Sequence, residues 1–353
     1  MKERLLALRP ILLRVIGYPL FFFFFFVVFL YATFPWDRLR EAIVAAAEAP
    51  RVSPSGRATP SNMELSIGSL SPTLLPGVEA RDVRVTFLPQ RAADRPVSMS
   101  IDKLRLRLSI FALLAQRASV SFSMLGLGGS VEGNASIALT PPATPRISPL
   151  RAFDVTLDRV HLGEVAPLVS MVGLPLGGSL SGTVEVNIPD GEVAQTEGTV
   201  RLTADRLTVG DGHAQFQIPH FGGVTIEQIR AGRLEANADI RRGVVTFTRI
   251  GAHSEEFDLQ IDGRIDLRPN FADSALNLGM RFRLTDVYRV KSEQAGRIMS
   301  VMDMAPDLRR ARRPDGLFAF RCTGTFERSI NCPPDSRATA TTPGAAMPAG
   351  FSP

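Results

Sequence analysis

Apolar and polar residues alternate with a period of two along most of the chain, as in strands that have one buried and one wet face. The alternation is strict in residues 103–108 of the segment 101–108, where Leu104 and Leu106 alternate with Arg105 and Arg107. A one-residue slip in pairing would turn every apolar row toward water, so the same pattern specifies the register of the strands. We therefore predict a mainly β fold built on a long antiparallel sheet, apolar on one side and polar on the other.

One apolar row keeps the same parity for the whole length of a predicted strand. It is a candidate apolar core or groove and consists of Leu276, Leu278, Met280, Phe282 and Leu284. Only a few segments depart from the period of two. Residues 37–48 have apolar residues at helical spacing, and Ile298, Met299 and Met302 suggest a second helix that ends before Pro306.

Residues 15–34 contain no charged side chain, and a helix of this length would be roughly 30 Å long, which matches the hydrocarbon core of a bilayer. We predict an uncleaved transmembrane anchor; a cleaved signal peptide and a buried core helix are the alternatives. Pro19 lies near the start of the run, where a lost backbone hydrogen bond costs least. The residues assigned to the anchor are Val15, Pro19, Phe21, Phe22, Phe23, Phe24, Phe25, Phe26 and Phe34.

Basic residues precede the apolar run, which predicts a cytoplasmic amino terminus, with the rest of the chain beyond the membrane. In a bacterium this places the protein in the inner membrane as a single-pass protein, with its bulk in the periplasm. Prolines and changes of period divide the chain further. The predicted parts are a cytoplasmic end (1–14), the anchor (15–34), a juxtamembrane helix and loop (35–62), a first β unit (63–140), a Pro-rich linker (141–150), a second β unit (151–330) and a disordered tail (331–353).

Charge and cysteine content narrow the classes of function. The net charge of +5 comes from the amino-terminal cluster and from the arginines at 309–313, without the basic and aromatic face that nucleic-acid binding requires. We therefore expect no nucleic-acid partner. The two cysteines, Cys322 and Cys332, are ten positions apart and would either form a disulfide in an oxidising compartment or remain free thiols.

No arrangement of residues in the sequence points to catalysis. The four histidines are far apart and none belongs to a metal-binding motif, while Glu255 and Glu256 are adjacent and would point to opposite faces of a strand. The glycines at 126, 128 and 129 precede another alternating segment, whereas a phosphate-binding loop needs a helix there. We expect no catalytic residue, no metal site and no cofactor.

Several short blocks of sequence carry a resemblance, although none is a catalytic signature. They are Tyr18-Pro19-Leu20, residues 33–39, residues 67–72, Gly173-Leu174-Pro175-Leu176, residues 207–212 and Arg313-Pro314-Asp315-Gly316. In this order they resemble the type II secretion system protein N (GspN) family. The resemblance implies an AsmA-like fold with a long curved sheet, and an inner-membrane component of the machine that exports folded proteins across the outer membrane.

Two functions follow from this resemblance. In the first, the protein is a non-enzymatic periplasmic scaffold whose strand edges or polar face dock other type II secretion components. In the second, it is a lipid-binding or lipid-transfer protein whose apolar β-groove shields acyl chains. The expected partners are therefore secretion components and membrane lipid.

Overall fold

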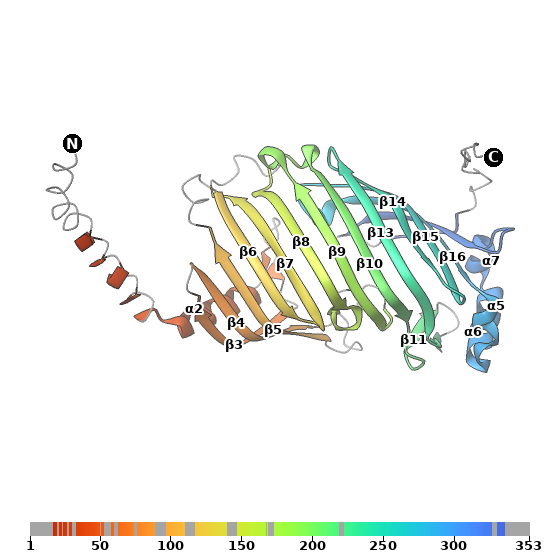
Figure 1. Cartoon of the computed structure of the whole chain (residues 1–353). Helices are drawn as coiled ribbons and strands as arrows, with labels where there is room; N and C mark the ends of the chain where they lie inside the picture. Colours follow the sequence, from red (N-terminus) through yellow and green to blue (C-terminus); the bar gives the residue numbers. More distant parts are fainter. Residues whose placement is uncertain are drawn as a thin grey trace, which may run out of the picture. The chain divides into compact units, whose positions relative to one another are not determined.

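The computed structural model is mainly β, with thirteen long antiparallel strands and a few short helices (Figure 1). It describes residues 17–19, 21–22, 24–26, 28–29, 33–49, 51–52, 58–59, 63–73, 76–88, 97–109, 117–139, 147–166, 168, 173–218, 222–326 and 330–335. The chain forms two compact units, Met1–Arg107 and Leu108–Pro353. This boundary differs from the predicted one at 141–150.

After residue 35, the described residues of the first unit form one helix and three long strands. Its elements are α2 (Trp36–Glu48), the short strands β1 (Arg51–Val52) and β2 (Ala58–Thr59), and then β3 (Met63–Pro72), β4 (Gly77–Phe87) and β5 (Val97–Leu108). The helix expected at 37–48 is confirmed. The helix lies against β3, where Arg40 donates to the Gly68 carbonyl (3.2 Å) and Glu48 accepts from the Leu65 N–H (3.2 Å).

The apolar row of the first unit changes parity in the middle of each strand. Val83 and Ala80 are both buried although they are three positions apart, which a regular strand does not allow. Register explains this, because Ile67 pairs with Val83 and Ser69 with Arg81, so that one residue in each strand is left out of the pairing. The register is the same on both sides of this point, so no residue is inserted. Asp82, the unpaired residue of β4, has a φ of 53°, in the left-handed region, and this local turn of the backbone brings Ala80 and Val83 to the same side.

The described residues of the second unit form the other ten long strands, three short helices and a separate two-stranded ribbon. The long strands are β6 (Arg117–Gly126), β7 (Gly129–Ala138), β8 (Leu150–His161), β9 (Leu176–Asn187), β10 (Glu197–Val209), β13 (Ile229–Arg241), β14 (Val244–His253), β15 (Phe257–Asp266), β16 (Ala275–Leu284) and β17 (Phe318–Thr325). The ribbon is β11 (Gln215–Ile218) with β12 (Gly222–Thr225), and the helices are α5 (Asp286–Lys291), α6 (Glu293–Met304) and α7 (Pro306–Ala311). Four single turns of 3-10 helix complete it: η1 (Leu162–Glu164), η2 (Pro189–Gly191), η3 (Val193–Gln195) and η4 (Phe271–Asp273).

Pairing within the second unit follows chain order, with the ribbon left outside the sheet. Because β7 pairs with β8, the Pro-rich stretch at 141–150 connects two neighbouring strands and does not separate two sheets. Asp211 and Gly212, whose Asp-Gly pair predicts a hairpin turn, lead from β10 into the ribbon, while β10 itself pairs with β13. The Asp211 carboxylate caps this turn by accepting from the N–H groups of His213 and Ala214, which lowers its pKa.

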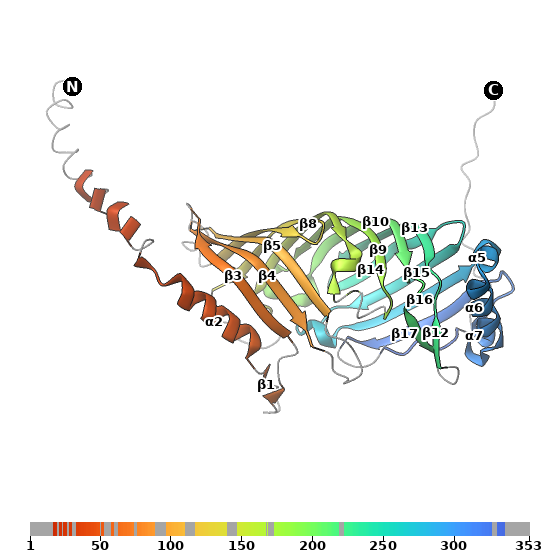
Figure 2. The same cartoon turned by 90° about the horizontal axis from the view of Figure 1, so that it is seen from below.

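The sheet of the second unit is curved, since β15–β17 lie below β8–β13 in Figure 2 instead of continuing beside them. Its apolar residues face the inside of this curve. Phe257 of β15, for example, packs against a cluster that includes Ala204 of β10 and Ala231 of β13. Pairing keeps apolar residues opposite one another, as in Val184, Val200 and Ala238 on three successive strands.

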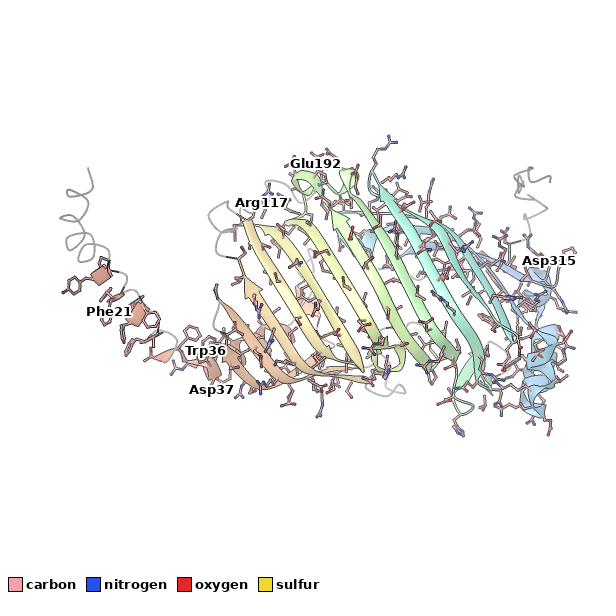
Figure 3. All side chains as sticks on the ribbon, viewed as in Figure 1. Phe21, Trp36, Asp37, Arg117, Glu192 and Asp315 are labelled. Atoms are coloured by element: carbon pink, nitrogen blue, oxygen red, sulfur yellow. A yellow bond between two sulfur atoms is a disulfide. The ribbon has the colours of Figure 1, made fainter. Side chains whose placement is uncertain are left out.

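The amino-terminal apolar run lies only partly within the described residues. Residues 17–19, 21–22, 24–26, 28–29 and 33 are helical, and the side chains of Phe21 and Phe22 are 62% and 72% exposed. Figure 3 labels Phe21 in this segment. Val15 and Phe23 lie outside the described residues. In the described part of the chain, no helix is both long enough and apolar enough to cross a membrane. The anchor at 15–34 therefore stays a prediction.

Candidate functional site

The candidate site is the apolar face of the second unit, which is unevenly covered. In the row on β16, Leu276 and Leu284 at the two ends are buried (4% and 8% exposed), whereas Leu278, Met280 and Phe282 between them are half-buried. The same holds on β6, where Val120, Phe122 and Met124 are all half-buried. The interior of the curve is thus packed at particular places and partly open along its length.

Aromatic rings line part of this apolar face. The Phe282 ring lies 5.5 Å from that of Phe318 and 5.9 Å from that of Phe320, measured between ring centroids. At the other end of the unit, Phe122 of β6 and Phe153 of β8 are 6.4 Å apart on either side of β7. The residue between them is Gly133, and a Cβ atom there would lie 2.7 Å from the Phe122 ring. The glycine therefore leaves room for the ring to lie across β7.

Helices α5 and α6 close one end of the apolar face. Tyr288 is fully buried and packs with Leu284, Ala295 and Met299. Its hydroxyl donates to the Glu227 carbonyl (2.9 Å), and burial, with the nearby Glu227 and Glu256 charges, raises its pKa. Since these contacts join α5 to a segment 61 residues earlier, the helices are held against the end of the sheet.

A buried carboxylate, that of Glu256, links α5 to the sheet. Glu256 accepts hydrogen bonds from the Arg230 N–H (2.9 Å) and Nε (2.7 Å), and from Lys291 Nζ (3.0 Å) at the end of α5. Burial alone would raise the pKa of Glu256, but the hydrogen bonds from Arg230 and Lys291 outweigh it and lower the pKa. Glu256 is therefore an ionised link between the sheet and the helical end.

The outer edge of β17 is covered by the segment that follows it. Thr323 and Asn331 exchange two backbone hydrogen bonds (2.9 and 3.0 Å), and Arg321 N–H donates to the Pro333 carbonyl (3.0 Å). Cys322 and Cys332 are joined by a disulfide in this pairing. Residues 331–335 are thus ordered, although the expected disordered tail began at 331, and they occupy an edge that we expected to be open to strand addition.

His253, Ser254 and Asp258 are the described residues that come nearest to a catalytic group. His253 Nδ1 contacts an Asp258 oxygen, but Arg283 pairs with the same carboxylate. Burial alone would raise the pKa of Asp258, and these two partners lower it. The Ser254 hydroxyl donates to the Arg230 carbonyl (2.7 Å), not to histidine. The three residues therefore stabilise a turn and an ion pair.

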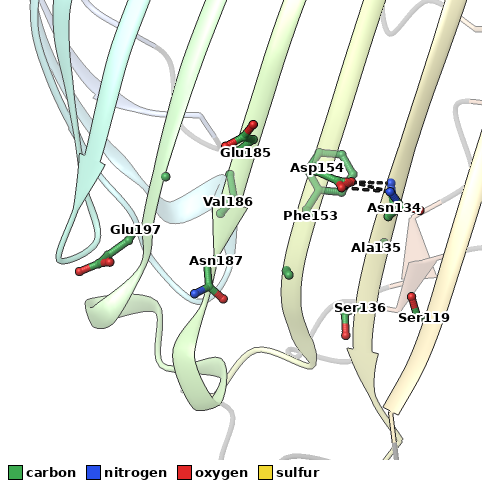
Figure 4. A pocket seen from close by; sticks show the side chains of 12 residues that line it. Ser119, Asn134, Ala135, Ser136, Phe153, Asp154, Glu185, Val186, Asn187 and Glu197 are labelled. Atoms are coloured by element: carbon green, nitrogen blue, oxygen red, sulfur yellow. Dashed lines mark hydrogen bonds between the residues drawn. The ribbon is translucent and has the colours of Figure 1, made fainter. Parts of the chain in front are cut away.

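The polar side of β7–β10 carries a shallow hollow of about 450 Å³ (Figure 4). Asn134 and Asp154 are hydrogen-bonded there (3.0 Å), while Glu185 and Glu197 lie on the neighbouring strands. Within the described ranges no group of three or more His, Cys, Asp or Glu residues is arranged to hold a metal ion. The hollow is also lined by the hydroxyl groups of Ser119 and Ser136 and by Asn187, so it is a polar surface of carboxylates, amides and hydroxyls.

The row predicted on β16 is one part of a larger surface, and the hydrophobic pattern carries no information about how that surface ends. The residues that close it, Tyr288 and Glu256, are brought together by contacts between segments that are distant in sequence. Helix α6 is an exception, because the helical spacing of Ile298, Met299 and Met302 predicts it from the sequence. Its start is capped by Ser292, whose side chain accepts from the Ala295 N–H (3.1 Å).

The second unit defines a class of β protein with a curved antiparallel sheet, an apolar inner face and a helical end. Comparison of the whole chain with protein-family models, with curated proteins and with solved structures found no match.

Proposed function

We propose that the apolar face of the second unit binds the acyl chains of membrane lipids, and that the protein is a non-enzymatic, AsmA-like protein of the bacterial inner membrane. The observation that carries this proposal is the middle of the β16 row. Leu278, Met280 and Phe282 remain half-buried although the ends of the row are closed. Apolar side chains left in contact with water are stabilised when an apolar ligand covers them.

The dimensions of the surface suit an acyl chain. The half-buried stretch of β16 from Leu278 to Phe282 covers roughly 13 Å at about 3.3 Å per residue, comparable to the roughly 15 Å of hydrocarbon in one leaflet of a bilayer. Each methylene group buried contributes about 0.8 kcal/mol, so partial burial of one chain is enough for retention. The ring-lined stretches at Phe122 and Phe282 extend the surface across the sheet.

The test measures how much lipid remains bound to the full chain after purification in mild detergent. Leu278→Asn with Met280→Asn makes the half-buried stretch polar, and we expect the phospholipid measured by mass spectrometry to fall several-fold. Thr246→Asn with Gln260→Asn changes two exposed positions on the opposite face and serves as the matched control. Equal lipid content in the two variants would refute the proposal.

The second candidate function is the scaffold of a type II secretion system, and the blocks at 33–39, 67–72 and 207–212 favour it by their resemblance to the GspN family. In this case the polar face of β6–β10, and not the covered edge of β17, would dock other secretion components. Co-purification with those components and loss of exoprotein release on deletion would support the scaffold. Normal release by a deletion strain would refute it.

A further inference from the structure

The polar face of the first unit carries a compact group of basic side chains. Pairing between β4 and β5 places Arg81 beside Lys103 and Gly77 beside Arg107. Glu79 and Arg105 form the pair between them. We call Arg81, Lys103, Arg105 and Arg107 the basic cluster. Three of its four positive charges contact the single carboxylate of Glu79 and Arg107 lies beside them, which leaves three positive charges in excess.

Glu79 organises the cluster by pairing with three of its cations. Its carboxylate contacts Arg81 (2.8 Å), Lys103 (3.3 Å) and Arg105 (2.6 Å) while its own side chain is buried. Hydrogen bonds from Arg105 and Arg81 lower the pKa of Glu79 to about 2, so it stays ionised. The cations are therefore held in place by one anion and still present unbalanced charge to the solvent.

The cluster borders a hollow that can admit a ligand. A depression of about 530 Å³ is lined by Arg81, Arg105, Arg107 and the Glu79 that they surround, with Ser71, Pro72 and Thr73 at the end of β3. Arginine side chains bind phosphate oxygens through paired N–H groups. The cavity therefore has both the charge and the hydrogen-bond donors for a phosphate group.

We propose that the basic cluster binds the phosphate headgroup of anionic phospholipids. A lipid is the favoured source of the phosphate, because the same unit contains the apolar run at 15–34, whose described phenylalanines are exposed. Lysine and arginine near a membrane surface are attracted to its anionic lipids. The inference rests on the proposed membrane anchor, but it does not depend on acyl-chain binding by the second unit.

The test is competition between lipids on the detergent-purified full chain. Phosphatidylglycerol and phosphatidylethanolamine are added in equal amounts, and the bound ratio is read by native mass spectrometry. We expect an excess of phosphatidylglycerol that falls roughly tenfold in Lys103→Gln with Arg107→Gln. In this variant Arg81 and Arg105 still form ion pairs with Glu79. The charge-matched control, Arg241→Gln with Arg242→Gln in the second unit, should keep the excess.

Each outcome decides the proposal. No excess in the wild-type chain, or an excess that survives Lys103→Gln with Arg107→Gln, would overturn it. Inorganic phosphate that displaces phosphatidylglycerol at equal concentration would overturn the lipid as the source of the phosphate. The Leu278→Asn and Met280→Asn variant, run in parallel, separates the two sites. It should lower total bound lipid yet keep the preference for phosphatidylglycerol.

Discussion

Replacing Glu256 by Gln tests whether the buried carboxylate holds the helical end onto the sheet. The Glu256 side chain is 3% exposed and pairs with Arg230 and Lys291. Removing one partner of a buried ion pair costs about 3–5 kcal/mol, because a charge is left uncompensated. Here the cost is smaller, since the Arg230 and Lys291 side chains are 67% and 21% exposed and water can solvate them. We expect a loss of about 2–3 kcal/mol.

The measurement combines denaturant unfolding with hydrogen exchange. The free energy of unfolding should fall by the stated amount. Relative to the wild type, amide exchange should speed up more in α5 and α6 than in β6–β8, because Lys291 lies at the end of α5. Glu255→Gln is the matched control, since Glu255 is the exposed neighbour and should change stability by less than about 0.5 kcal/mol. Equal stability and equal exchange in α5 and α6 for the two variants would refute the reasoning.

Three further predictions concern other parts of the chain. Cys332→Ser should free residues 331–335 from β17 and lower the denaturation midpoint, with the loss matched by adding reductant to the wild type; an unchanged midpoint would contradict this. Phe24→Arg with Phe25→Arg should release the protein from the membrane fraction, since each central arginine costs about 2.5–3.5 kcal/mol; intact fractionation would exclude the anchor. The lowered pKa of Glu79 stabilises the fold above its unfolded pKa, so unfolding midpoints should fall as the pH drops from about 4.5 toward about 2, and Glu79→Gln should flatten that dependence.

Local pattern was sufficient for the strands and for two helices, the one at 37–48 and the one that ends before Pro306. The alternation along 276–284 is a real strand face, and the helical spacing at 37–48 is a real helix, because both depend on side-chain periods within a single element. The place where the apolar row changes parity was beyond this kind of prediction. It depends on a residue such as Asp82 being left out of the pairing at the same level in adjacent strands, which is a property of the pairing.

The sequence by itself determined that this is a β protein with two-faced strands and a charge-free amino-terminal run, because hydrophobic period and charge are local properties. Only the tertiary structure decided which surfaces remain open. Glu256 meets Lys291 from 35 residues away, Tyr288 reaches Glu227, and residues 331–334 cover β17. Such contacts follow from how the sheet curves and where its ends meet the helices, and the period of a single strand carries no information about either.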